Sequence, residues 1–300
     1  MSLAEMTVPA AAPVAAPSAQ TGPARSAPRR LVSTRLLRSE LRMVFQRRRN
    51  QAVLVVLAAI PVLIAVAVRL SAPKPGEGPP FLSDITSNGV FVALTALTVV
   101  LPFFLPLAVA VVSGDAVAGE ASLGTLRYLL TVPVSRARLL LVKYAGVVAY
   151  CLAATLAVAL VGVLIGLSLF PVGQVTMLSG SQITYSSALG RLLLVALYIA
   201  ASMAALGAIG MFVSTLTESP VAAMATTAVL AIASQVLDSV PQLHVIHPWL
   251  FSHYWTTYGD LLRAPISTDG IVHGMLAAAG YLAVFGSLAW SRFSGKDVSS

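Results

Sequence analysis

Three histidines lie within a short aromatic segment, and imidazole nitrogens are common ligands of transition metals. The segment reads PQLHVIHPWLFSHYWTTYGDLLRAP over residues 241 to 265 and contains His244, His247 and His253. Their spacing matches no recognised ligand motif, and no carboxylate accompanies them before Asp260. Hydrogen bonding at a membrane interface is therefore favoured over a metal site. The surrounding tryptophans and tyrosines predict short interfacial or re-entrant helices.

The motifs of several enzyme classes are absent. No histidine precedes a glutamate as in H-E-x-x-H, and no serine lies in a G-x-S-x-G turn. Gly295 and Lys296 resemble the end of a P-loop, but Asp297 follows them and Trp290 occupies the place of the first glycine. The single cysteine, Cys151, lies in an apolar run and is expected to pack there. The sequence thus predicts no catalytic residue, no metal and no cofactor bound by this chain.

The stretch GEASLGTLRYLLTVPVSR, residues 119 to 136, contains residues that shape the backbone. Gly119 and Gly124 permit turns or a close approach by another group. Pro133 cannot continue a preceding helix, and Ser135 can cap a helix that begins at Arg136. The pattern predicts a helix, a break and a second helix.

The same stretch offers a surface to a partner. Leu126, Leu129 and Leu130 form an apolar face at helical spacing, and Glu120 and Arg127 are expected to face water or a partner. Thr125 lies beside them. An ordinary cytoplasmic linker would also explain these charges, so both interpretations stay open.

The composition is that of a membrane protein. Of the 300 residues, 57% are hydrophobic and 10% are charged, and the mean hydropathy is +0.87. The chain contains six apolar runs that are each long enough, or nearly so, to cross a bilayer. Such runs cross as helices, because a helix satisfies its own backbone hydrogen bonds. We therefore predict an all-α fold with six transmembrane helices. The runs are approximately Gln51–Val68, Val90–Val112, Tyr144–Leu169, Leu192–Leu216, Val221–Leu237 and Ile271–Trp290.

The positive charge indicates membrane orientation rather than nucleic-acid binding. If both termini are cytoplasmic, fifteen of the 19 basic residues lie on the inner side. The loop around residues 114 to 143 then faces the cytoplasm, while segments 70 to 89, 170 to 190 and 241 to 270 face outward. We expect a multi-pass protein of the cell membrane.

Four regions follow from these patterns. Residues 1–28 are rich in alanine and proline and are expected to be a disordered tail. Residues 29–49 are expected to form a basic amphipathic helix on the inner membrane surface, or a plain basic anchor. Residues 50–292 are the six-span domain, and residues 293–300 are a cytoplasmic tail. The two stripes of the helix are Leu37, Leu41 and Val44, and Arg35, Arg38 and Arg42.

These features together resemble the ABC-2 permease family, the membrane subunit of type-2 ABC transporters. The resemblance covers about residues 30 to 298 and is carried by the basic N-terminal helix, the six spans, and GE, GTLR, PVSR and a later lysine between spans two and three. In that family the loop between these spans docks on a separate ATPase. The matching positions are Gly119, Glu120, Gly124, Thr125, Leu126, Arg127, Pro133, Ser135, Arg136 and Lys143. Many relatives carry an acidic residue where Arg127 stands.

The resemblance implies that this chain pairs with a second permease copy or paralogue and with a cytoplasmic ABC ATP-binding subunit that holds ATP and magnesium. It favours export of an amphipathic, lipid-like or drug-like substrate, with membrane lipid around the chain and no nucleic acid. An ion-gradient carrier is the first alternative, although its usual ionisable residues are nearly missing from the predicted spans. A membrane scaffold or sensor is the second.

Overall fold

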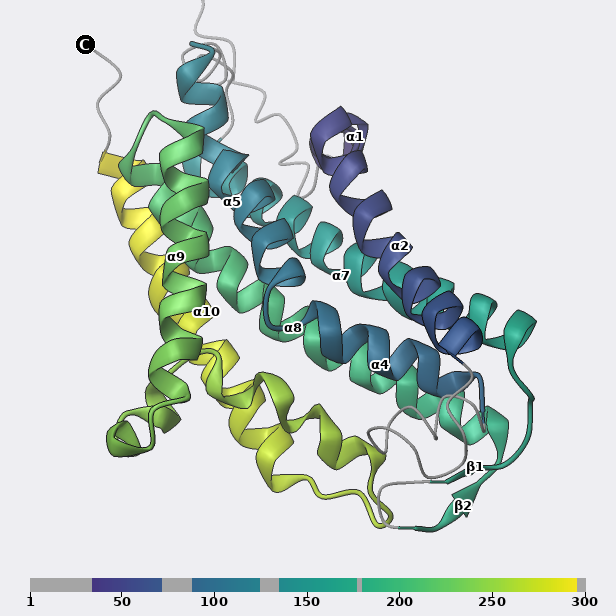
Figure 1. Ribbon diagram of the computed structural model, residues 1–300. Helices are drawn as coiled ribbons and strands as arrows, with labels where there is room; N and C mark the ends of the chain where they lie inside the picture. Colours follow the sequence, from purple (N-terminus) through teal and green to yellow (C-terminus); the bar gives the residue numbers. More distant parts are fainter. Residues whose placement is uncertain (1–33, 72–87, 125–134, 177–179, 296–300) are drawn as a thin grey trace, which may run out of the picture. The chain divides into compact units, whose positions relative to one another are not determined.

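The computed structural model describes residues 34–71, 88–124, 135–176 and 180–295 (Figure 1). The chain divides into two units, Met1–Ser33 and Thr34–Ser300, and the second contains every described element. The predicted tail 1–28 and the first residues of the predicted N-terminal helix lie outside the described residues. The helices are α1 Thr34–Gln46, α2 Arg48–Ser71, α4 Val90–Val100, α5 Phe104–Ser122, α7 Arg136–Leu169, α8 Tyr185–Leu216, α9 Pro220–Asp238 and α10 Asp269–Gly295.

Six of the described helices are long and apolar enough to cross a membrane, namely α2, α5, α7, α8, α9 and α10. The predicted all-α, multi-pass character agrees with this finding. Helices α5 and α8 are the most enclosed of the six, whereas α10 is the most exposed. Because the exposed faces of the outer helices are apolar, they suit contact with lipid or with another membrane subunit.

The second predicted span is two helices rather than one. Helix α4 ends at Val100 and α5 begins at Phe104, so the chain breaks around Pro102. Proline lacks an N–H and clashes with the preceding turn, which interrupts the helix. The side chain of Gln235 on α9 donates a hydrogen bond of 2.6 Å to the Pro102 carbonyl, one of the backbone groups that the break exposes.

Other spans extend beyond their predicted ends. Helix α7 joins the helix predicted to begin at Arg136 to the span predicted from Tyr144, and α10 continues through Gly295 instead of ending at Trp290. The prediction followed the apolar runs alone, but a helix continues until its backbone or caps stop it. As a result, Asp115, Glu120 and Lys143 lie within helices that qualify as candidate spans.

Small residues bring α4 and α7 into backbone contact. Gly162 and Gly166 of α7 lie one turn apart, and a Cβ added at Gly166 would stand 2.1 Å from the Gly89 carbonyl oxygen. One added at Gly162 would stand 2.5 Å from the Cα of Ala93. This is the small-xxx-small packing by which helices associate where hydrophobic burial gives no driving force.

Helix α1 ends at Gln46, before the predicted end at residue 49, and has both predicted faces. Leu37 and Leu41 are partly buried and Val44 is buried, whereas Arg35, Arg38 and Arg42 are exposed. The apolar face packs against α7, where the Val44 side chain lies beside Gly146. The apolar face of α1 is therefore buried by α7.

The segment between α9 and α10 forms three 3₁₀ helices, η1 Pro241–Leu243, η2 His247–Trp249 and η3 His253–Leu262. Its aromatic residues differ in burial. Trp249 is exposed, but Trp255 and Tyr258 are buried in the core. The Tyr258 hydroxyl lies 2.7 Å from Thr98 Oγ1, which itself donates to the Leu94 carbonyl. Burial raises the pKa of Tyr258, so its hydroxyl stays neutral and donates to Thr98.

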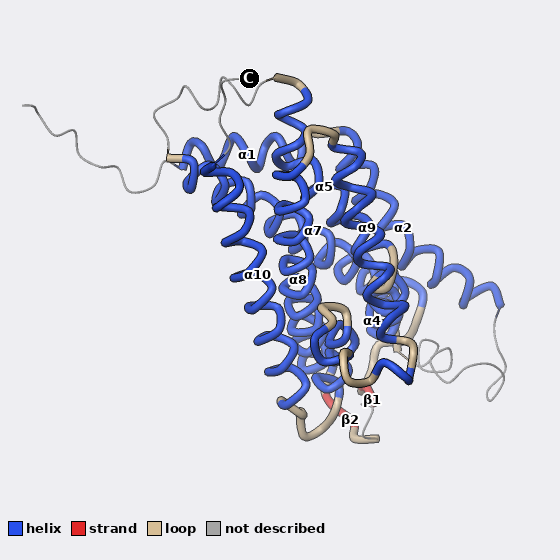
Figure 2. Tube along the Cα trace, turned by 90° about the vertical axis from the view of Figure 1, so that its left-hand side faces the viewer, coloured by secondary structure: helices blue, strands red, loops and turns tan. Residues whose placement is uncertain are grey.

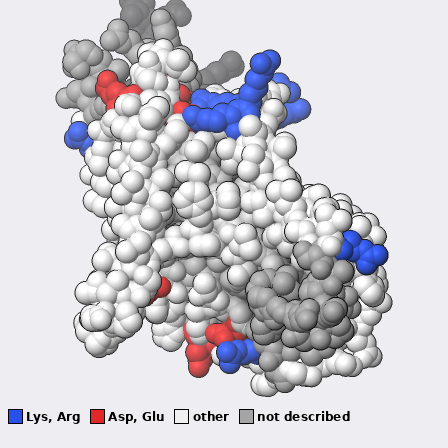
Figure 3. Space-filling view, in the orientation of Figure 1, with Lys and Arg blue, Asp and Glu red and all other residues white. Residues whose placement is uncertain are grey.

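A small hairpin departs from the purely helical prediction. Strands β1 Val175–Thr176 and β2 Gln182–Ile183 pair antiparallel in the connection between α7 and α8. At the opposite end of the bundle, α1, the end of α5, the beginning of α7 and the end of α10 lie together (Figures 1 and 2). On the face seen in Figure 3, charged side chains gather toward the two ends, and most of the surface between these ends is free of charge.

Candidate functional site

Six ionisable side chains meet where α1, α2, α5 and α7 converge. We call them the ion-pair cluster. Its members are three carboxylates and three cations, so their formal charges balance. They are Glu40 of α1, Arg47 between α1 and α2, Arg49 of α2, Asp115 and Glu120 of α5, and Lys143 of α7.

Lys143 is the most buried member, with 1% of its surface exposed. Its ammonium contacts Glu120 Oε1 and lies 3.4 Å from Glu40 Oε1. A buried ammonium requires such partners, because transfer from water to a low-dielectric interior costs several kcal/mol. Three helices, α1, α5 and α7, are thereby joined through one nitrogen.

Asp115 forms the other half of the cluster. Its Oδ2 contacts Arg47 and lies 3.0 Å from Arg49 Nη2. Gly119, one turn later on α5, leaves room for this carboxylate, since a Cβ there would stand 2.4 Å from Asp115 Oδ1. The predicted close approach at Gly119 is therefore made by a side chain of the same helix.

A cavity of about 20 Å³ lies within the cluster, lined by all its members except Arg49 and also by Asn50. This volume is sufficient for about one water molecule, and the surrounding groups supply hydrogen-bond partners. The cluster is thus a polar centre enclosed by apolar helices, with Val112 and Val147 completing the wall.

The structure describes both ends of the stretch predicted to couple to an ATPase. Gly124 has φ +68, a conformation that suits glycine and ends α5 in a turn, as predicted. Ser135 is the N-cap residue of α7, also as predicted, but its side chain makes no capping hydrogen bond. Thr125, Leu126, Arg127, Leu129, Leu130 and Pro133 lie outside the described residues.

One charged residue of this stretch, Glu120, differs from its predicted role. Glu120 was expected to face water or a partner, but it is buried, with 4% of its surface exposed, because Lys143 binds it from α7. Arg136 donates a hydrogen bond of 2.7 Å to the Ser294 carbonyl. Its guanidinium thereby binds the end of α10, where cations are favoured by the helix dipole.

Helix α8 holds the same part of α5 by another contact. The Ser214 hydroxyl donates to the Gly114 carbonyl at 2.6 Å and accepts from the N–H groups of Val117 and Ala118. One side chain is therefore inserted beside the backbone ladder of α5, next to Asp115.

Sequence reasoning missed Glu40 and Asp115 as members of a site, because acidic residues scattered singly gave no motif. A usable signal was present in SGDAVAGE, residues 113–120, where each acidic residue follows a glycine directly after an apolar run. Acidic side chains that continue an apolar helix require cationic partners, and two partly exposed arginines just before the first predicted span, Arg47 and Arg49, bind Asp115.

The histidine segment has a carboxylate neighbour that its prediction did not include. His247 and His253 lie beside a carboxylate, that of Asp238 at the end of α9. Asp238 precedes the histidines in the chain, whereas the prediction took account only of Asp260, which follows them. His244 is not part of the group.

The family comparison covers most of the chain. A family described as "Protein of unknown function (DUF2705)" matches residues 55–299, which include α4 to α10 and most of α2. A search of curated proteins finds no match. Because the family match extends over well more than half of the 300 residues, this chain belongs to the DUF2705 family.

Proposed function

We propose that this chain is the membrane-spanning subunit of an ATP-driven transporter of the ABC-2 class, located in the cell membrane with both termini cytoplasmic. A separate ABC subunit would bind ATP and magnesium, and a second permease copy or paralogue would complete the transport path. The proposed activity is export of an amphipathic, lipid-like or drug-like substrate. The 3₁₀ helices between α9 and α10 would lie at the outer interface.

The ion-pair cluster is the observation that carries this proposal. The stretch proposed to dock on the ATPase, residues 119–136, includes the whole connection from α5 to α7. Lys143 ties these two helices to each other and to α1, and Arg136 ties the start of α7 to the end of α10. A displacement of the connecting segment would therefore move four helices together.

The physical reason is the cost of separating the buried ions. Breaking a buried pair by removing one partner costs about 3–5 kcal/mol, so the helices joined by Lys143 resist moving apart. Helix α7 is a single helix of 34 residues, from Arg136 to Leu169. A force applied at its first turn is transmitted along its length, because helices move as rigid elements between hinges.

The peripheral helices support the proposed pairing of two permeases. Helices α9 and α10 have exposed apolar faces that include Val229, Val284 and Leu288. In a monomer these faces contact lipid, and in a symmetric dimer part of them would be shared by two copies. The dimer contact itself is part of the proposal.

The decisive experiment uses the variant Leu126→Asp, which places a charge on the predicted apolar docking face. The tagged full chain is purified from its native membranes, the co-purifying P-loop ATPase is identified, and both are reconstituted in liposomes. We expect the variant to lose at least about tenfold in ATPase affinity, corresponding to about 1.4 kcal/mol, at unchanged membrane abundance.

Val245→Asp is the matched control, because Val245 is exposed in the segment that connects α9 to α10 and is far in sequence from the docking stretch. It should retain the ATPase and substrate-stimulated hydrolysis. Normal ATPase retention and transport by Leu126→Asp would show that residues 125–134 are an ordinary linker.

One observation favours an ion-gradient carrier as a second candidate. Asp115, Glu120 and Lys143 are buried within candidate spans, and ionisable residues in such places often bind coupling ions. Purified protein in liposomes with an imposed proton or sodium gradient and no ATPase separates the two candidates. Substrate accumulation under these conditions would favour the carrier.

A further inference from the structure

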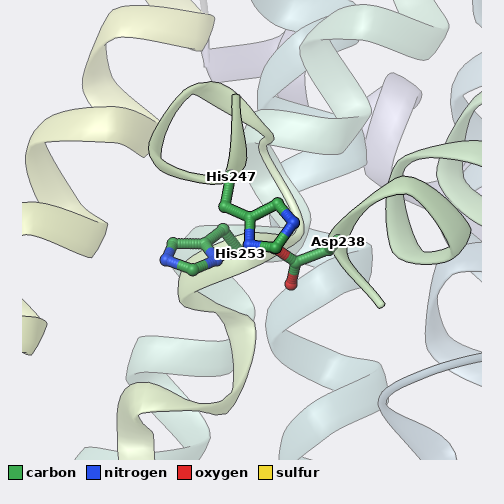
Figure 4. Close-up of side chains that lie close together, drawn as sticks. All are labelled: Asp238, His247 and His253. Carbon is green, nitrogen blue, oxygen red and sulfur yellow. Dashed lines mark hydrogen bonds and ion pairs between the residues drawn. The ribbon is translucent and has the colours of Figure 1, made fainter. Parts of the chain in front are cut away.

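The end of α9 and the following 3₁₀ helices bring two imidazoles and one carboxylate together. Asp238 is the last residue of α9, His247 is the first of η2, and His253 is the first of η3 (Figure 4). The three side chains point toward one another although they come from three separate elements. One candidate ligand atom from each lies within 4.8 Å of the other two.

The local backbone explains this convergence. After α9 the chain turns through η1, and the carbonyls of His247 and Leu250 accept hydrogen bonds from the N–H groups of Leu250 and His253 in turn. The hydroxyls of Ser234 and Ser252 lie 2.6 Å apart, which joins the residue preceding His253 to α9. Both imidazoles are thus returned to the end of the helix that carries Asp238.

The hydrogen bonding of His247 leaves one ring nitrogen available as a ligand. Its Nε2 lies 3.1 Å from the Val240 carbonyl, which can only accept, so Nε2 carries the proton. In the neutral ring Nδ1 then presents a lone pair, and it lies 3.9 Å from Asp238 Oδ1. Two acceptors face each other at a distance too long for a direct hydrogen bond, an arrangement that a cation between them stabilises.

The bond from His247 to a backbone carbonyl is also the support that metal-binding histidines commonly have. It fixes the tautomer and the ring orientation. His253 Nδ1 lies 2.7 Å from the same Asp238 oxygen, so in the metal-free chain its proton occupies part of the space that a cation would take. Binding would shift the neutral ring to the tautomer with its proton on Nε2 and so make Nδ1 the second nitrogen ligand.

The donor set selects the class of metal. Two imidazole nitrogens and one carboxylate oxygen suit zinc and related transition ions, whereas magnesium and calcium prefer oxygen ligands. Bond lengths of about 2.0–2.1 Å in tetrahedral geometry place ligand atoms roughly 3.3 Å apart. The observed separations of 2.7 and 3.9 Å differ from this by about half an ångström each.

Access to the group is open. The side chains of His247, His253 and Asp238 are 16%, 34% and 25% exposed. A metal ion can therefore enter from solvent, and three protein ligands leave a fourth position for water or an external ligand.

We propose that Asp238, His247 and His253 form a binding site for a divalent transition metal of the zinc class, with one coordination position open. The bound ion joins the end of α9 to η2 and η3. Because η3 also packs Trp255 and Tyr258 into the core, the metal stabilises the whole connection between α9 and α10. The site is independent of the proposed transport function.

Zinc binding to the purified full chain tests the site. The protein carries an affinity tag without histidine or cysteine, is stripped with a chelator, and is titrated with zinc chloride by calorimetry and by metal analysis after dialysis. We expect one zinc ion per chain. His253→Ala and His247→Ala should each weaken zinc binding by at least about tenfold. Loss of a residue that only supports a metal ligand already lowers metal affinity by about this factor, and loss of the ligand itself should lower it at least as much.

His244→Ala is the matched control, because His244 lies in the same segment but outside the group. It should keep one zinc ion at unchanged affinity. If an alanine variant is poorly folded, cobalt absorption of the wild-type chain provides an independent readout, with the visible bands of a four-coordinate nitrogen and oxygen site. Absence of saturable zinc binding to the wild-type chain, or equal affinity in His253→Ala and His244→Ala, would overturn the proposal.

Discussion

At the scale of single residues, the ion-pair cluster shows how charges are retained inside an apolar bundle. Lys143 does not reach solvent but is compensated by carboxylates on two other helices. Asp115 is compensated by arginines on the opposite side of the same polar centre. Each charge is therefore tolerated only while its partners stay in place.

The first prediction concerns Lys143. Lys143→Met leaves Glu120 and Glu40 without their buried cation and should destabilise the chain by about 3–5 kcal/mol. Thermal unfolding can be followed with a thiol-reactive dye, because the single cysteine, Cys151, is buried in the core. The double variant Lys143→Met, Glu120→Gln should recover part of the loss. Strictly additive losses would contradict a direct pairing of the two side chains.

A second prediction tests the space at Gly119. Gly119→Ala places a methyl group against the Asp115 carboxylate and should displace it from Arg47 and Arg49, at a cost of about 1–3 kcal/mol. Gly190→Ala on α8 is the control, since nothing lies within 4 Å of its added Cβ. The melting temperatures of the two variants are compared, and equal values would mean that Asp115 adjusts without loss.

At the scale of elements, two features hold the helices together. Small residues allow close helix contacts, and side chains form hydrogen bonds with backbone groups that a helix break leaves unpaired. Helices α4 and α7 approach through Gly89, Ala93, Gly162 and Gly166. The break between α4 and α5 is supported by Gln235 from α9. Both features determine how the first half of the bundle is assembled.

The third prediction belongs to this scale. In Gly166→Ala the added methyl would meet the backbone carbonyl of Gly89, which cannot rotate away as a side chain does. We expect a loss of about 3 kcal/mol or more in stability and lower membrane abundance. Gly280→Ala on α10 meets nothing within 4 Å and should be tolerated. Similar abundance and melting temperature of both variants would show that α4 and α7 can separate at little cost.

At the scale of the whole molecule, α10 ends on the side on which α2 begins (Figures 1 and 2), because six crossings bring the chain back to the side from which it started. The hydrogen bond from Arg136 to the end of α10 is consistent with this arrangement. In the proposed topology, which rests on the distribution of basic residues, that side faces the cytoplasm.

The fourth prediction tests this orientation by cysteine labelling in a Cys151→Ala background. A cysteine at Ser122, exposed at the end of α5, should react with an impermeant reagent only after the membrane is opened. A cysteine at Val245, between α9 and α10, should react in intact cells. Labelling of the Ser122 position from outside would reverse the proposed topology.

The sequence by itself determined the features that depend on neighbouring residues along the chain. Length and apolar composition identified the six spans, and residue types predicted the turn at Gly124, the start of α7 at Arg136 and the two faces of α1. Only the tertiary structure decided which distant groups meet. Lys143 and Glu40 are separated by 103 residues, and Asp238 and His253 by 15. A charge or an imidazole takes its function from the partners that packing brings to it, and no local pattern encodes that pairing.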